Sequence, residues 1–340
     1  MKRHRWLFGF VTMLLVIAVV YWWFNGYGRP YSAAAPIRQD STSLKQTVFV
    51  PTLDTPLTQG KSSVWCAAFE LAWKRAENDL IKNALRTQNS PEISARLNSS
   101  LTSENDVAPE SLTIQSPDIQ PNGIGASAKI KLDIPFKIPF FENDVPFEFK
   151  DSKGTTTKVA SFGIRPKDEY AYYQLRSQVA VLGTVHDNSN YNLTEFAVDL
   201  DRNSNPYQIV LAVISPKSTL EEDVEYVKNM KPEWKRGIGP NDRLLVPNQN
   251  WEFHHQFKEL LGPITNPGFA DKPLVEASET VRFKLDRSGA ELSSEAKVYY
   301  LPIPNLYYFN RPFLVYIQKR GAAQPMFAAW VENAELLQKY

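Results

Sequence analysis

Hydrophobic and polar residues alternate with a period of two along much of the chain after residue 127. Ala128, Ile130, Leu132 and Ile134 alternate with polar residues, which predicts a half-buried strand. The same alternation, or a run of β-branched and aromatic residues, predicts strands at 147–149, 155–162, 170–174, 177–184, 193–199, 208–214, 242–246, 281–285, 290–300, 313–318 and 326–331. The pattern favours an α+β fold with large, mostly antiparallel β-sheets and a reduced set of helices.

A helical period is confined to a few segments. Apolar residues recur with helical spacing over 62–86, and a serine at the start of that segment can cap a helix. A second helix is predicted over 216–229, with Ser218 as its cap, and a short one over 253–261. The polar stretch 87–125 is expected to be a long connection with one short helix.

The first 25 residues have the pattern of a membrane anchor. An uncharged apolar stretch, 6–24, follows the basic cluster 2–5 and is long enough to cross a bilayer as a helix. The basic cluster should stay cytoplasmic, which places the rest of the chain outside the cytoplasm. The alternative is a secreted protein, since the small residues at 32–35 could form a signal-peptide cleavage site.

This interpretation divides the chain into three parts. Residues 1–25 are a cytoplasmic basic tip and transmembrane anchor. The stretch 26–60, rich in Gly, Pro, Ser, Thr and Gln, is expected to be a linker, and 61–340 a folded extracytoplasmic domain.

Composition narrows the function. The chain has 38 basic and 37 acidic residues, a balance that argues against a nucleic-acid-binding protein. Its one cysteine, Cys66, cannot form an intrachain disulfide and is expected to be a buried apolar residue. The sequence has no phosphate-binding glycine loop, no nucleophile elbow and no metal-ligand spacing, so we expect no enzyme activity, no cofactor and no metal site.

A series of segments, in the same order along the chain, resembles elements of one known protein family. Residues 281–296 (VRFKLDRSGAELSSEA) resemble the serpin strand that runs into the hinge of the reactive-centre loop. Residues 309–317 (FNRPFLVYI) resemble the element after that loop, and 326–331 (MFAAWV) the closing strand, although alanines stand where serpins usually carry a glycine. Weaker matches in the same order extend the resemblance over 127–332. Before residue 127 the match is poor, so several serpin helices are expected to be missing.

The resemblance implies a reactive-centre-like loop at 290–305. Its hinge would consist of Gly289, Ala290, Glu291, Leu292, Ser293, Ser294, Glu295 and Ala296. Counting back from Phe309 places the scissile bond near Leu301-Pro302, and counting forward from Gly289 places it near Ile303-Pro304. The candidate scissile region is Tyr299, Tyr300, Leu301 and Pro302, although a bond after either tyrosine would lie at an unusual position in the loop. A tyrosine would suit a chymotrypsin-like protease, whereas a proline after the scissile bond resists most serine proteases.

Loop insertion into a sheet makes a physical demand on the sequence. One face of the inserted strand must be buried, so alternate residues must be uncharged. Residues 290, 292, 294, 296, 298 and 300 meet this demand, as those of any half-buried antiparallel strand would. Together with the predicted anchor, the resemblance implies a membrane-anchored inhibitor of an extracytoplasmic serine protease. The alternative is a non-inhibitory module that binds another envelope protein on a serpin-derived scaffold.

Overall fold

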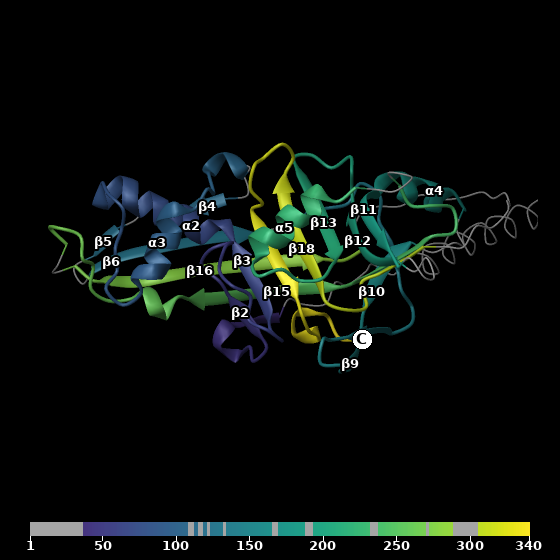
Figure 1. The fold of residues 1–340 in the computed structure, drawn as a ribbon, viewed down its shortest axis with the longest axis horizontal. Coiled ribbons are helices and arrows are strands. Elements are labelled where there is room, and N and C mark those ends of the chain that lie inside the picture. Colours follow the sequence, from purple (N-terminus) through teal and green to yellow (C-terminus); the bar gives the residue numbers. More distant parts are fainter. Residues whose placement is uncertain are drawn as a thin grey trace, which may run out of the picture. The chain divides into compact units, whose positions relative to one another are not determined.

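A computed structural model of the chain describes residues 37–107, 112–114, 118–120, 123–131, 134–164, 169–187, 193–231, 237–269, 272–287 and 305–340. Two large sheets and two small ones account for the strands in these ranges (Figure 1). The predicted anchor 6–24 lies outside the described residues. Among the described ones, no helix is long and apolar enough to cross a membrane.

The first large sheet has six strands. Its order is β1 (Ile37–Asp40), β15 (Gln249–Gln256), β16 (Leu274–Leu285), β6 (Gly123–Lys131) and β4 (Leu112–Ile114), with β5 (Asp118–Gln120) also paired to β6. The sheet is mixed, because β1 runs parallel to β15 and β16 runs parallel to β6, whereas β15 and β16 are antiparallel.

The second large sheet has seven strands. Its order is β11 (Ala180–His186), β12 (Leu193–Asp199), β13 (Tyr207–Val213), β18 (Phe313–Lys319), β19 (Phe327–Val331), β3 (Ser62–Cys66) and β2 (Thr47–Phe49). The pairs along it are antiparallel except β2 with β3.

Two small sheets complete the β structure of the described residues. One has the order β17 (Leu306–Tyr308), β14 (Arg243–Pro247), β10 (Ser161–Ile164) and β7 (Phe141–Glu142). The other is the hairpin of β8 (Phe147–Lys150) and β9 (Thr156–Val159).

Helices are few in the described part of the chain. They are α2 (Ala67–Ala76), α3 (Pro91–Ser99), α4 (Glu169–Gln178) and α5 (Leu220–Asn229), with a π-helical turn η2 (Glu77–Ile81) after α2. Single 3-10 turns lie at Ser41–Ser43, Glu104–Asp106, Lys258–Leu260 and Ala334–Leu336.

The main core lies between the two large sheets. Figure 1 shows the strands of the seven-stranded sheet crossing the long strands β15 and β16 steeply. The rings of Trp251 and Phe283, from the six-stranded sheet, contact Phe327 of β19 at centroid distances of 6.1 and 4.7 Å. Each of these aromatic side chains removes a large apolar area from water, so their contact stabilises the packing of one sheet on the other.

The structure corrects the predicted helix over 62–86. Its first five residues form β3, all of them buried and paired with β19 on one side and β2 on the other. A strand buried on both faces has no polar–apolar alternation, so periodicity cannot distinguish it from a buried helix. The helix begins only at Ala67.

Two more elements differ in type from the prediction. Residues 170–174 belong to helix α4, in which Leu175 is buried and the Gln178 side chain forms two hydrogen bonds with the backbone of Ile138. The predicted helix 253–261 begins with the last four residues of strand β15, and only a 3-10 turn follows them. Trp251 and Phe253 of β15 are fully buried and alternate as in a strand. The strand ends in the polar residues 254–256, which interrupt this alternation in the sequence.

The linker and one helix cap also require correction. Residues 37–40 and 47–49, expected in the linker, are β1 and β2 of the two large sheets. Helix α5 is capped by Thr219, whose side chain accepts a hydrogen bond from the Glu222 N–H, rather than by Ser218.

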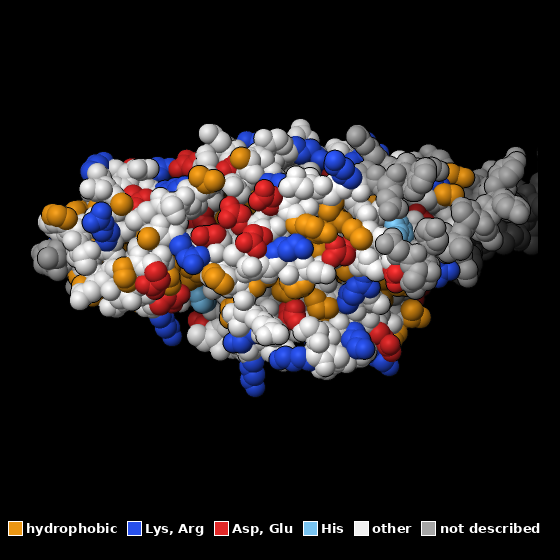
Figure 2. Space-filling view, viewed as in Figure 1, with side chains coloured by type: hydrophobic (Ala, Val, Ile, Leu, Met, Phe, Trp, Pro, Cys, Tyr) orange, Lys and Arg blue, Asp and Glu red, His pale blue; other side chains and the backbone are white. Residues whose placement is uncertain are grey.

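The charges on the described surface are mixed. On the face drawn in Figure 2, Lys and Arg side chains are interspersed with Asp and Glu, and acidic side chains gather near its middle. Glu221 lies close to other acidic groups, and its pKa is raised by burial and then by the nearby charges of Asp54 and Glu225.

Candidate functional site

The predicted hinge residues 289–296 and scissile region 299–302 lie outside the described residues. The structure does define both ends of the connecting segment 288–304. On one side β16 ends at Leu285, and two hydrogen bonds then join Arg287 to Phe140. The Phe140 N–H donates to the Arg287 carbonyl at 3.2 Å, and the Arg287 Nε donates to the Phe140 carbonyl at 3.1 Å. On the other side the Asn305 N–H donates a hydrogen bond to the Asp242 carboxylate at 2.7 Å, and the next residue begins β17.

These two ends belong to different sheets. The neighbours of β16 are β15 and β6 in the six-stranded sheet, whereas β17 pairs with β14 in a four-stranded sheet. The connecting segment therefore does not join two hydrogen-bonded neighbours, as the loop of a β-hairpin would. A chain that leaves one sheet and enters another is the arrangement that the sequence resemblance implies.

Beside the segment's starting point lies a parallel strand pair, which we call the seam. It is formed by β6 and β16, which pair from Leu274 opposite Ile124 to Arg282 opposite Lys131, with one register shift between Leu274 and Glu276. On one face of β16, Ala277 and Val281 are fully buried. On the other face, Arg282 pairs with Glu252 of β15 at 3.5 Å.

The seam contains an unpartnered acidic residue. Glu279 is 1% exposed and lies between Ala277 and Val281 on the buried face of β16. Neither of its carboxylate oxygens has a hydrogen-bond partner among the described residues. Burial, with a smaller contribution from the charge of Glu70, raises the pKa of Glu279 well above its usual range and so favours its neutral form.

The neighbouring Glu70 is buried but satisfied. It accepts hydrogen bonds from the Trp65 indole N–H at 2.9 Å and from the Ser100 hydroxyl. Cys66 lies in the same region and is fully buried, as predicted. Burial raises the pKa of its thiol well above the usual value, which leaves little reactive thiolate.

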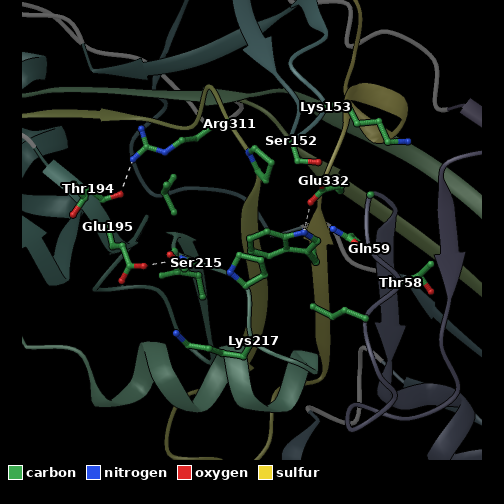
Figure 3. A pocket seen from close by; sticks show the side chains of 17 residues that line it. Thr58, Gln59, Ser152, Lys153, Thr194, Glu195, Ser215, Lys217, Arg311 and Glu332 are labelled. Atoms are coloured by element: carbon green, nitrogen blue, oxygen red, sulfur yellow. Dashed lines mark hydrogen bonds between the residues drawn. The ribbon is translucent and has the colours of Figure 1, made fainter.

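A cleft lies at one end of the seven-stranded sheet (Figure 3). Its volume is about 800 Å³, within the range of small-molecule sites. It is lined by the start of β12, the residues after β13, those before β18 and the end of β19, together with the chain at 57–60 and the β8–β9 turn.

Neither Glu279 nor the cleft is predicted from the sequence. Glu279 could have been found, because it is the one charged residue in the buried alternation Ala277, Glu279, Val281, Phe283. The cleft has no such signal, because its walls come from several separate stretches of sequence. Among the described residues, no group of three or more His, Cys, Asp or Glu side chains could hold a metal ion.

Comparison with known proteins finds similarity in structure only. No protein-family model and no curated protein sequence matches the chain. Among solved structures, the thermophilic serpin tengpin in its native state matches with a TM-score of 0.40 at 15% identity, over 63% of this chain and 57% of that one. Native protease nexin-1 with heparin matches with 0.41 at 11% identity, over 62% and 56%. Human thyroxine-binding globulin complexed with thyroxine matches with 0.41 at 14% identity, over 64% and 58%.

All three are serpins, the family that the sequence resembles. The chain spans less than three fifths of the length of each of them.

Proposed function

We propose that the chain is a serpin-like protein that presents residues 288–304 to an extracytoplasmic serine protease and can take that segment into the seam after cleavage. The observation that carries the proposal is the direct parallel pairing of β6 and β16, next to the point where the segment begins. A strand that enters between two parallel strands can run antiparallel to both. A segment that leaves the end of β16 and folds back on it has that direction.

The sequence of the segment suits such an insertion. Its even-numbered positions from 290 to 300 are uncharged and would face the core, whereas the charged residues Glu291, Glu295 and Lys297 lie at odd positions. The strands of the seam are also suited to separating. On the buried face Glu279 has an unsatisfied carboxyl group where an apolar side chain would pack, and such a group lowers the stability of the closed pair.

Incubation with a chymotrypsin-like protease tests the proposal. We expect cleavage within 297–304, an SDS-stable complex of enzyme and full chain, and a higher unfolding temperature of the cleaved form, since insertion adds a strand to the six-stranded sheet. Cleavage elsewhere, or cleavage without a gain in heat stability, would contradict it.

Two adjacent serines provide matched variants. Ser294→Asp places a charge on the core-facing side of the inserted strand, and Ser293→Asp places the same charge on the opposite side. We expect both variants to be cleaved, but only Ser294→Asp to lose the gain in heat stability. Equal behaviour of the two would show that the segment does not insert with this alternation.

A second candidate function is a non-inhibitory binding module of the cell envelope. Two residues favour it. Pro302 and Pro304 are the second residues of the candidate scissile bonds Leu301-Pro302 and Ile303-Pro304, and a proline at that position resists most serine proteases. On this hypothesis the same incubation gives no cleavage within 297–304 and no covalent complex, while the chain binds another envelope protein.

The location is proposed from residues 1–25. We place the described domain outside the cytoplasm, held by a helix over 6–24. Alkaline carbonate should leave the full chain in the membrane pellet, with an N-terminus that still begins at Met1 or Lys2. A soluble product that starts after residue 35 would instead favour the secreted form.

A further inference from the structure

The cleft at the end of the seven-stranded sheet has an apolar floor. Val213 and Ile214 at the end of β13 and Trp330 of β19 line it, and each is at most 5% exposed. Leu57, Pro216 and Pro312 extend this apolar surface toward the rim. A flat or aliphatic apolar group could therefore lose its contact with water here.

Cationic side chains stand around this floor. Figure 3 shows Arg311, Lys153 and Lys217 on three sides of the cleft, each from a different segment. The Lys217 ammonium lies 3.9 Å from the centre of the Tyr226 ring, a cation–π contact that holds it in place. The Lys153 side chain packs against Gly60, where an added Cβ would come within 3.0 Å of its Cε.

Arg311 is the cation best placed to bind a ligand. It is half-buried and donates one hydrogen bond, to the backbone carbonyl of Thr194 at 2.7 Å. It forms no ion pair with any carboxylate of the described residues. Burial lowers the pKa of its guanidinium, partly opposed by the charge of Glu195. A half-buried guanidinium with unused donors is suited to a planar anion.

The two carboxylates in the cleft already have partners. Glu195 accepts hydrogen bonds from the Ser215 N–H at 2.8 Å and the Tyr226 hydroxyl at 2.6 Å, and Glu332 accepts one from the Trp330 indole N–H at 2.7 Å. Their charge is thus directed into the protein, whereas the cations stand around the open volume. The charge that faces the open volume is therefore mainly positive, which favours an anionic ligand over a cationic one.

From this arrangement we infer that the cleft is a binding site for a small amphipathic carboxylate, whose acid group pairs with Arg311 and whose apolar body covers Trp330. The inference is independent of the connecting segment 288–304 and of any action on a protease. The domain would then bind a small molecule, which neither the sequence pattern nor the proposed function predicts.

Calorimetric titration of the full chain tests the inference with two matched probes. One is 1-naphthylacetate, and the other is its uncharged amide, 1-naphthylacetamide. We expect the carboxylate to bind at least about 10-fold more tightly than the amide, because a charge-assisted hydrogen bond in a partly dry site is lost in the second case. Equal affinities, or no binding of either probe at millimolar concentration, would overturn the inference.

Two variants test whether Arg311 is the group that binds the carboxylate. Arg311→Gln should remove the preference for the carboxylate, whereas Arg86→Gln, which removes the same charge at an exposed position outside the cleft, should leave it unchanged. An unfolding curve shows whether Arg311→Gln is folded. If it is not, Lys217→Gln is the test variant, and it should weaken binding of the carboxylate about 3-fold or more. A preference that survives in the folded variant would exclude Arg311 as the anion-binding group.

Discussion

Replacing Glu279 by glutamine should stabilise the protein, and increasingly so as the pH rises. In the unfolded chain this carboxyl ionises around its ordinary pKa of 4.5, whereas in the folded chain burial raises its pKa well above that value. A raised folded-state pKa means that the stability present at pH values below the unfolded pKa is lost as the pH rises toward the folded pKa. Glutamine has no proton to lose and should not show this dependence.

The magnitude follows from the linkage relation. Each pH unit above the unfolded pKa costs about 1.4 kcal/mol for as long as the folded group stays protonated. Between pH 5 and pH 7 the difference in unfolding free energy between Glu279→Gln and the wild type should therefore grow by up to about 3 kcal/mol. Glutamine still leaves an unpartnered buried polar group, so at pH 5 the two proteins should be similar.

Urea unfolding followed by circular dichroism measures this difference at pH 5, 6, 7 and 8. Glu259→Gln is the matched control, because that carboxyl is exposed on the turn after β15. The control should run parallel to the wild type at every pH. A Glu279→Gln variant that also runs parallel to the wild type would mean that the carboxyl is ionised in the folded protein, contrary to its buried and unpartnered position in the seam.

Three further predictions concern buried charges. Burial lowers the pKa of His255 to about 4, so wild-type stability should fall as the pH drops from about 6.5 toward 4, and His255→Gln should flatten that loss in urea midpoints. Burial raises the pKa of Asp223 to about 7, so Asp223→Asn, which can still accept the Lys217 N–H, should raise the midpoint at pH 8 but not at pH 4. Arg320 pairs with the buried Asp199 at 3.0 Å, so Arg320→Met should cost about 2–4 kcal/mol in thermal unfolding, and adding Asp199→Asn should recover part of that loss.

The strands of the seven-stranded sheet between residues 193 and 331 were the most predictable elements. The predicted strands 193–199 and 208–214 correspond closely to β12 and β13, and 313–318 and 326–331 to β18 and β19. In these segments β-branched and aromatic residues bounded by turn residues agree with the local preference for strand.

The failures have a common physical cause, which is that tertiary burial overrides the local period. Residues 62–66 form a strand buried on both faces although their pattern predicts a helix, and residues 170–174 are helical in spite of their aromatic content. The parallel pairing of β6 and β16 was also beyond prediction, because the two strands lie far apart in the sequence. For the same reason the cleft, which is built from distant segments, could be found only in the structure.

A disulfide across the seam tests whether the cleaved segment enters between β6 and β16. Ser127 and Ser278 lie opposite each other on β6 and β16, and the natural Cys66 is buried, so a Ser127→Cys/Ser278→Cys variant could lock the two strands together. After cleavage within 297–304, we predict that the reduced variant gains heat stability and that the oxidised variant does not. A full gain in the oxidised variant would show that the cleaved segment does not enter between β6 and β16.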